Sequence, residues 1–185
     1  MREEAIRRIF LHQPVYSPTP SRGLRQAAAL VPLDVEKGVW LTRRSPFLLT
    51  HAGQVAFPGG KIDETDVSAE AAAFREAQEE VGLNPVQAEA LGRLPDYTTT
   101  TGYHITSVVA LVASGVELQP EAAEVEEIFA LPFSVLLNPD YPIRRTVVSE
   151  GIERSFWVWP HADHVIWGAT AAILRQLALR LRAVS

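Results

Sequence analysis

The sequence predicts one domain of the α/β (α+β) class, in which a mixed β-sheet is sandwiched between α-helices. Two observations support this prediction. Short apolar runs, typical of strands, stand on both sides of one amphipathic helix, and the chain from Asp163 onward is apolar at helical spacing. The length of 185 residues suits a single domain over 1–185 with a proper core.

The N-terminal part predicts a short helix followed by a loop and a hairpin. Ile6, Ile9 and Phe10 share one face of a helix. Residues 13–23 are rich in proline and serine and are expected to form a loop. Two apolar stretches within residues 24–43 flank the sequence DVEKG, which predicts a hairpin with its turn there.

The central helix has the best-defined ends. Asp66 or Ser68 is expected to cap its start. Gly82 is expected to end it, with Pro85 just beyond. Trp167 is expected to lie in the core, within the C-terminal helix. The remaining expected elements are strands near 53–57, 87–94, 104–113, 125–131, 143–148 and 152–159, and a short helix near 133–137.

Composition excludes several classes of protein. The formal net charge of −5 lacks the basic footprint of a nucleic-acid-binding protein. The absence of cysteine excludes disulfides and thiolate metal sites. No apolar run approaches the roughly 18 residues that a membrane span needs, and the N-terminus has no apolar stretch typical of a secretory signal. We therefore expect a cytoplasmic protein with neither a nucleic-acid nor a membrane partner, and the sequence leaves its oligomeric state open.

The most informative segment is REAQEEVGL, residues 75–83. Glu76, Glu79 and Glu80 stand three and four residues apart, so they fall on adjoining parts of one helix surface. Such a surface can hold hard divalent cations. Glu76 and Glu80 lie together beside the apolar stripe, whereas Arg75 can pair with Glu79. A solvated acidic face is the alternative, because like-charge pairs at this spacing cost only about 0.2–0.5 kcal/mol.

Two glycines precede this helix in the segment AFPGGK, residues 56–61. Gly59 and Gly60 can adopt positive φ and can let the backbone approach a metal or a phosphate. A plain turn between a strand and a helix is the alternative.

The segment from Gly60 to Leu83 closely resembles the Nudix box, G-x5-E-x7-R-E-U-x-E-E-x-G-U, where U is a bulky apolar residue. The matching residues are Arg75, Glu76, Glu79, Glu80, Gly82 and Leu83. Three features depart from the pattern. Asp66 stands where the first glutamate is expected, one extra residue separates it from Arg75, and Ala77 is smaller than usual at the first U position.

Residues 41–60, LTRRSPFLLTHAGQVAFPGG, resemble the signature of the coenzyme A pyrophosphatase branch, roughly L-L-T-x-R-S-x-x-L-x-x-H-x-G-x-V-x-F-P-G-G. His51 matches, and the arginine of the signature falls on Arg43 or Arg44. The extra residue in the box is also a feature of that branch. Further segments that look like it are TGYHIT at 101–106, EVEEIFALP at 124–132 and IWGATAAIL at 166–174.

This resemblance implies a Nudix fold and hydrolysis of the diphosphate in coenzyme A and its derivatives. The products would be 4′-phosphopantetheine, or its acyl form, and adenosine 3′,5′-bisphosphate. It also implies Mg²⁺ or Mn²⁺ held by Glu76, Glu79 and Glu80 and by a backbone carbonyl at Gly59 or Gly60. Glu76 and Glu80 rank first as direct ligands.

The same resemblance suggests roles for other residues. Arg75 is expected to orient Glu79. The general base is a box glutamate or a later one, with Glu124 and Glu127 as candidates and a solvated surface acid as the alternative. The candidate contacts to substrate phosphates are Arg43, Arg44, His51 and Lys61. For His51, structural support of its loop is the favoured interpretation.

Two other functions remain open at this point. The first is a Nudix hydrolase of another small nucleotide, such as ADP-ribose, NADH or a dinucleoside polyphosphate. The second is a Nudix-fold binding module without catalysis. The presence of all three box glutamates counts against the second.

Overall fold

The computed structural model describes residues 2–11, 23–149, 151–162 and 164–183. An eight-stranded sheet forms the body, with the strand order β3-β2-β1-β7-β5, while β4 pairs with β1, β6 with β7 and β8 with β2. Its strands are β1 (Arg25–Asp34), β2 (Gly38–Arg44), β3 (Val55–Ala56), β4 (Gly59–Lys61), β5 (Ala88–Arg93), β6 (Tyr97–Thr98), β7 (Tyr103–Val112) and β8 (Val125–Leu131). A three-stranded sheet contains β9 (Ile143–Ser149), β10 (Ile152–His161) and β11 (His164–Trp167). The helices are α1 (Glu3–Leu11), α2 (Ala69–Val81), the 3₁₀ turn η1 (Pro85–Gln87), α3 (Phe133–Leu136) and α4 (Gly168–Arg182).

The body sheet is mixed, because β1 and β7 run parallel while the other pairs are antiparallel. β1 has different neighbours along its length. Its end pairs with β2 across a turn that Asp34 closes by accepting the backbone N–H groups of Glu36 and Lys37. Its beginning pairs with β4, with Ala28 opposite Gly60. β4 contacts α2 as well as β1, so the two adjacent glycines lie beside the acidic helix.

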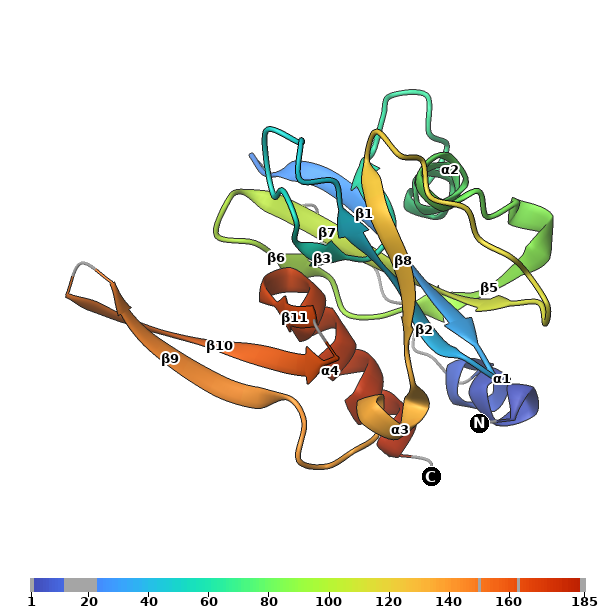
Figure 1. Ribbon diagram of the computed structural model, residues 1–185. Helices are drawn as coiled ribbons and strands as arrows, with labels where there is room; N and C mark the ends of the chain where they lie inside the picture. Colours follow the sequence, from blue (N-terminus) through green and yellow to red (C-terminus); the bar gives the residue numbers. More distant parts are fainter. Residues whose placement is uncertain (1, 12–22, 150, 163, 184–185) are drawn as a thin grey trace.

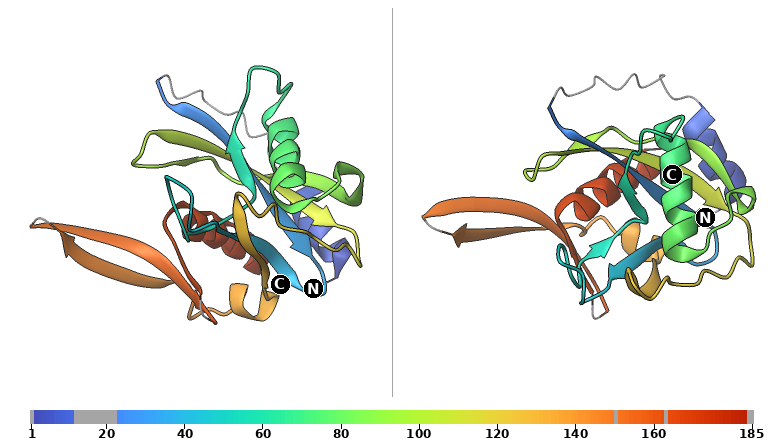
Figure 2. Two further views of the ribbon diagram at one scale, coloured as in Figure 1. Left: turned by 45° about the horizontal axis from the view of Figure 1, so that its top comes forward. Right: turned by 90° about the horizontal axis from the view of Figure 1, so that it is seen from above.

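Helices cover both faces of this sheet (Figures 1 and 2). Alternation along β1 explains the two layers, since successive side chains point to opposite faces. Ala28 and Leu30 pack in the cluster beneath α2. Val31 and Leu33 pack in the larger cluster that contains residues of α1 and α4. The predicted fold class, a mixed sheet between helices, is confirmed.

A long hairpin projects from the body (Figures 1 and 2). Its strands β9 and β10 are paired from Ile143 with Val158 to Ser149 with Ile152. The base of β10 is anchored, because Trp159 is fully buried and its Nε1 donates to the backbone oxygen of Ala171 at 3.2 Å. None of the described helices is long and apolar enough to cross a membrane.

The expected ends of the central helix are confirmed. The Ser68 hydroxyl accepts a hydrogen bond from the backbone N–H of Ala71 at 3.1 Å. Gly82 ends the helix in the left-handed region with φ of 67°, where glycine avoids the steric cost that a Cβ would impose. Asp66 does not cap the helix and is bonded elsewhere, as described below. The expected loop at 13–23 lies, apart from residue 23, outside the described residues.

The prediction of a helix throughout the C-terminal stretch is wrong at its start. His164–Trp167 form strand β11, which pairs with β10, and the helix begins at Gly168. The free edge of β10 supplies the backbone partners that favour a strand here. Trp167 is not in the core, because 46% of it is exposed.

Candidate active site

Glu80 is the most buried carboxylate of the acidic helix. It lies on the side of α2 that faces the sheet and is only 3% exposed. The backbone N–H of Gly59 donates to its Oε2 at 3.1 Å, and Nη1 of Arg44 approaches its Oε1 at 3.4 Å. Burial raises the pKa of Glu80 to about 7, although the Gly59 hydrogen bond and the Arg44 charge act in the opposite direction.

Glu76 lies one turn earlier on α2 and is also shielded from water. Arg75 Nη1 donates to its Oε1 at 2.9 Å. Burial nevertheless raises the pKa of Glu76, and the charges of Glu79 and Glu124 act in the same direction. Glu124 has the same effect on Glu80. The negative charge of Glu124, the residue just before β8, therefore acts on the half-buried Glu76 and on the buried Glu80.

The two adjacent glycines serve close packing, and neither of them adopts positive φ. A Cβ added to Gly60 would lie 2.5 Å from the carboxyl carbon of Glu76, and one added to Gly59 would lie 2.5 Å from the backbone oxygen of Ala28. Gly59 is required because a Cβ would meet backbone of the neighbouring strand, whereas a Cβ at Gly60 would force the Glu76 carboxylate to move.

Replacement of Gly60 by alanine is therefore expected to displace the Glu76 carboxylate. We expect the affinity for Mn²⁺, measured by electron paramagnetic resonance, to fall on the order of tenfold, as for other changes that misplace a ligand. In a Glu76→Ala background the same alanine should have no further effect, because its clash partner is gone. Unchanged Mn²⁺ affinity of the single variant would show that Glu76 does not hold the cation.

Arg75 is the centre of an ion-pair network that holds the acidic cluster together. Its guanidinium makes a two-pronged contact with Asp66, Nε to Oδ1 at 3.0 Å and Nη2 to Oδ2 at 2.9 Å. It also donates to Glu76, to Glu79 at 3.1 Å and to the backbone oxygen of Lys61. The contact to Asp66 lowers the pKa of that carboxyl. The shorter Asp66, which stands in place of the box glutamate, thus orients Arg75.

Glu79 faces away from the buried carboxylates. Its side chain is 59% exposed and is bonded to Arg75. The pairing that the spacing of Arg75 and Glu79 predicts is therefore present in the structure.

Replacement of Arg75 by alanine is expected to reduce activity about 10–100-fold, the usual cost of losing a group that orients metal ligands. Arg75→Lys should retain part of the activity at most, because one ammonium cannot reproduce the planar fork. Turnover at saturating Mg²⁺ measures the effect. Arg8→Ala, which changes an exposed arginine on α1, is the control. Full activity of both Arg75 variants would remove Arg75 from the catalytic machinery.

The two candidate arginines are adjacent at the end of β2, so their side chains point to opposite faces of the sheet. Opposite them the pairing with β8 is irregular, because Arg43 pairs with Glu127 and Arg44 with Val125, which leaves Glu126 of β8 as the extra residue. Arg44 turns to Glu80, whereas Arg43 pairs with Glu126 at 3.1 Å and with Glu127 at 3.4 Å. Of the two arginines, Arg44 is the one that the structure brings to the buried carboxylates.

The same arrangement separates the two candidate bases. Glu127 is engaged by Arg43 and by His164, whose Nε2 lies 3.5 Å from Glu127 Oε1. Glu124 is exposed just before β8, and its backbone oxygen accepts the N–H of Ser45 at 2.8 Å. That bond attaches the loop after Arg44 to the segment that carries Glu124. Glu124 is therefore the candidate base that stands beside the site.

His51 and Lys61 lie at the margin of the site. His51 has φ of 58° in the loop after β2, and its Nδ1 lies 3.0 Å from Gln54 Oε1. This contact is internal to the loop, as expected of a supporting residue. Lys61 ends β4 with an exposed side chain.

The donor set fits a hard divalent cation in chemistry, although it is not a ready-made cage. Among the described residues no group of three or more histidine, cysteine, aspartate or glutamate side chains stands arranged to hold a metal ion. Glu76 and Glu80 offer carboxylate oxygens, and burial raises the pKa of both groups in spite of their contacts with Arg75 and Arg44. Mg²⁺ binds in proteins through one or two carboxylates together with waters and substrate oxygens, so two such groups are sufficient.

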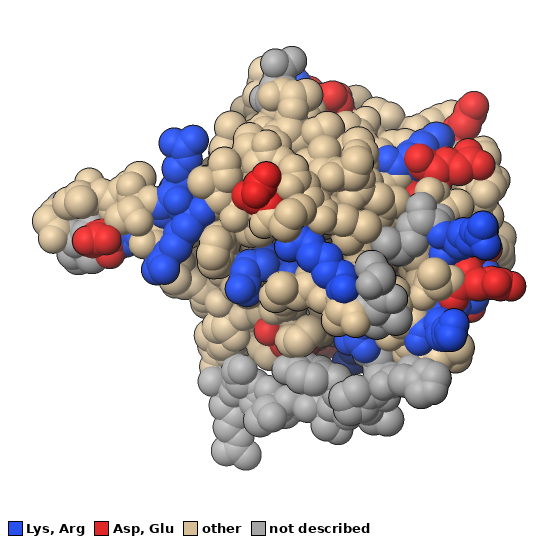
Figure 3. All heavy atoms as spheres, turned by 90° about the horizontal axis from the view of Figure 1, so that it is seen from below, with Lys and Arg blue, Asp and Glu red and all other residues tan. Residues whose placement is uncertain are grey.

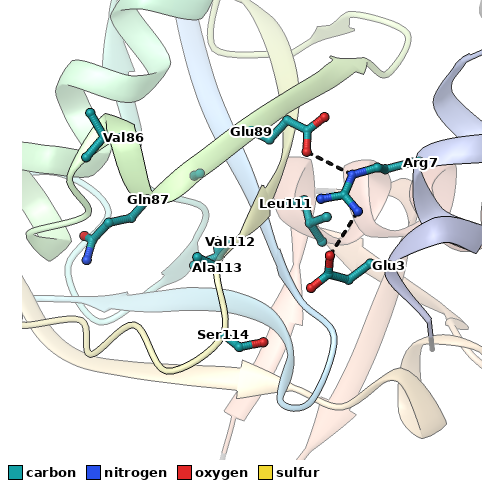
Figure 4. A pocket seen from close by; sticks show the side chains of 10 residues that line it. Glu3, Arg7, Val86, Gln87, Glu89, Leu111, Val112, Ala113 and Ser114 are labelled. Carbon is teal, nitrogen blue, oxygen red and sulfur yellow. Dashed lines mark hydrogen bonds and ion pairs between the residues drawn. The ribbon is translucent and has the colours of Figure 1, made fainter.

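One depression on the surface lies apart from these residues. It has a volume of about 400 Å³ and is lined by α1, η1, β5 and β7, without any of the predicted site residues (Figure 4). Arg7 reaches into it and is already bonded to Glu3 and to Glu89, at 3.0 Å each. Its charges are thus compensated within the protein.

The fold and this acidic helix define a class of protein. Residues 23–150 match the family model of the NUDIX domain, and the chain belongs to the Nudix family. An uncharacterized Nudix hydrolase, NudL, of Klebsiella pneumoniae (strain 342) is 40% identical over 171 residues, which cover 90% of this chain and 89% of the relative. NudL of Escherichia coli K12 is 40% identical over 159 residues, or 85% of this chain and 83% of the relative.

Solved structures agree on the fold. The MutT protein from Methanosarcina mazei Go1 has a TM-score of 0.50 at 21% identity over 64% of this chain and 84% of that one. The NUDIX domain of Shewanella oneidensis NrtR, crystallised with ADP ribose, has a TM-score of 0.50 at 22% identity over 65% of this chain and 80% of that one. At this identity the likeness shows the fold alone.

Proposed function

We propose that this chain is a metal-dependent diphosphatase that hydrolyses coenzyme A and its derivatives. One observation carries the hydrolase part of the proposal. Contacts with Gly59, Arg44 and Arg75 hold Glu76 and Glu80 side by side where water is partly excluded. Burial of these carboxylates costs desolvation free energy, and a bound cation would offset that cost. Nudix hydrolases generally need divalent cations such as Mg²⁺ or Mn²⁺ and act on small nucleotide substrates, which agrees with this chemistry.

Each residue of the site has a distinct part in the proposal. Glu76 and Glu80 would hold the cation, with a backbone carbonyl at Gly59 or Gly60 as a further oxygen. A bound divalent cation neutralises phosphate charge and lowers the pKa of water. Arg75 keeps Glu76 and Glu79 in place, and Glu79 stays the outermost carboxylate of the set.

The substrate would be bound and activated by residues around this core. Arg44 presents a guanidinium at the edge of the carboxylates, where a phosphate oxygen can accept from it. Lys61 at the end of β4 is the second candidate cation for the substrate phosphates. Glu124 is the proposed general base. Its charge raises the pKa of both Glu76 and Glu80.

The coenzyme A part of the proposal rests on the loop between β2 and β3. This loop carries the signature residues from Ser45 to Gly53 and begins at Arg44, which contacts Glu80. The backbone bond from Ser45 to Glu124, just before β8, supports a position of this loop near the acidic helix. The position is suitable for selecting among diphosphate substrates by contacts outside the reacting phosphates.

The test compares coenzyme A, acetyl-coenzyme A and ADP-ribose as substrates with Mg²⁺ and with Mn²⁺, with products identified by chromatography and mass spectrometry. We expect preferred cleavage of the coenzyme A substrates to adenosine 3′,5′-bisphosphate and the phosphopantetheine product. Preference for ADP-ribose, which has neither pantetheine nor 3′-phosphate, would overturn the assignment of the substrate. The assignment of the protein as a diphosphate hydrolase would still stand. No cleavage of any diphosphate with either metal would overturn the whole proposal.

A further inference from the structure

The small sheet of β9, β10 and β11 has an apolar face that is exposed over most of its length, while Val158 at its base is buried. Pairing in the small sheet places Ile143 opposite Val158 and Val158 opposite Trp167. Side chains alternate along each strand, so Val147, Phe156 and Val165 lie on this same face. The exposed fractions are 37% for Ile143, 46% for Val147, 61% for Val165 and 46% for Trp167. We call this face, with Phe156 included, the arm face.

The arm face is opposite to the face of the small sheet that packs on the body at the base of the arm, and toward the tip both faces of β9 are exposed. The other face of the small sheet carries Trp159 and Ile166, which are both buried in the main core. An isolated two-stranded hairpin is at best marginally stable in water, and large exposed apolar patches mark interaction sites. β9 is also an edge strand, so one of its sides has no backbone partner within the described sheet. These features together indicate a surface that is covered when the protein functions.

The charge of the arm face selects its partner. Arg145 stands opposite Phe156, and Arg154 opposite Val147, so both arginines share the face with the apolar side chains. The register places no acidic residue on the arm face within the described strands. No ion pair between described residues includes Arg144, Arg145 or Arg154. The underside of the molecule shows Lys and Arg side chains over the arm, α4 and α1 (Figure 3).

A second copy of this chain meets these requirements better than a membrane or a nucleic acid. Residues 143–161 hold three arginines and two glutamates, which give this segment a formal charge of +1. Because the formal net charge of the whole chain is −5, the rest of the chain has a charge of −6. A body with that charge is repelled by anionic lipids and by nucleic acids. The same body attracts the arm of another copy and offers exposed acids outside the proposed catalytic set, such as Asp63 and Glu121.

We propose that the arm is a dimerisation element that packs on the body of a second copy. Contact between two arm faces across a twofold axis would bring Arg145 and Arg154 of both copies together, at an electrostatic cost. Contact of each arm with the partner's body pairs those arginines with acids. One twofold axis generates both arm-to-body contacts, so the assembly closes as a dimer.

Sedimentation velocity on the full chain at a series of concentrations tests the proposal directly. We expect a concentration-dependent dimer that dissociates more readily at high salt, because part of the attraction is between opposite charges. Hydrogen exchange of the β9 backbone amides should slow as the dimer forms. A wild-type chain that stays monomeric at about 100 µM would overturn the proposal.

Matched variants distinguish the arm face from the rest of the surface. Val147→Asp, and separately Arg145→Glu with Arg154→Glu, should raise the dimer dissociation constant about tenfold or more. The controls are Val86→Asp, another exposed valine, and Arg8→Glu, another exposed arginine, and both should leave the dimer unchanged. Circular dichroism confirms folding, and the arginine pair tests the proposal even if Val147→Asp misfolds. A dimer insensitive to all arm substitutions, or a monomer that binds anionic vesicles through the arm, would overturn it.

Discussion

Replacement of Glu80 by glutamine is expected to lower kcat for the diphosphate substrate about 10³-fold. Glutamine keeps an oxygen to accept the Gly59 N–H, so the packing around residue 80 is retained. It removes the negative charge that would hold the cation. Loss of several kcal/mol of electrostatic stabilisation corresponds to about a thousandfold in rate.

The measurement is steady-state turnover with Mg²⁺, accompanied by Mn²⁺ affinity. Glu117→Gln changes an exposed glutamate away from α2 and is the matched control, with unchanged turnover expected. Undiminished turnover of Glu80→Gln would remove Glu80 from the catalytic machinery, whereas absence of turnover in the wild type as well would favour the non-catalytic binding module. Loss of turnover with full Mn²⁺ affinity would instead assign Glu80 to the reaction and remove it from the metal ligands.

The stability of the metal-free protein is expected to fall by about 3 kcal/mol between about pH 5 and pH 8. The folded protein raises the pKa of Glu80 from an ordinary value of 4.5 to about 7, chiefly by burial. In that interval the unfolded chain has released this proton while the folded chain still holds it, so each increase in pH favours unfolding. The stabilising contribution is complete below about pH 4.5 and is lost as the pH rises through about 7.

Glu76, whose pKa is also raised by burial, acts in the same direction. Asp66 and Glu70 have lowered pKa values, so their contributions are lost only at more acidic pH. Urea unfolding in the presence of a chelator, at both ends of the interval, measures the change. Glu80→Gln should flatten most of it, and Mg²⁺ or Mn²⁺ should restore stability at the alkaline end. An equally steep profile in Glu80→Gln would show that Glu80 keeps an ordinary pKa.

The sequence predicts most elements because their signals are local. The Ser68 cap and the Gly82 end of α2 follow from side-chain and backbone rules that act within one turn. The β9–β10 hairpin is likewise expected from two apolar runs around a short turn. The start of α4 is not predictable in this way, because Val165 and Ile166 form a strand only where β10 offers a free edge.

The candidate site divides along the same line. Spacing on one helix places Arg75 against Glu79 and sets Glu76 beside Glu80. No local pattern predicts the two hydrogen bonds from Arg75 to the Asp66 carboxylate. They form only after the segment between the two residues folds back. The two glycines of β4 do not need positive φ, and their close approach to Ala28 and to the Glu76 carboxylate depends on the pairing of distant segments, which no local pattern predicts.

Residue type and spacing within a few positions are enough to predict the class of fold, the acidic helix and its internal pairing. Only the folded chain shows that Glu80 is buried, that Arg44 rather than Arg43 reaches it, and that the arm carries a largely exposed apolar face. These properties depend on which strands become neighbours, through the pairing of β2 with β8 and of β4 with β1. Burial and contact between distant segments are consequences of that pairing, and they set the charges at the site.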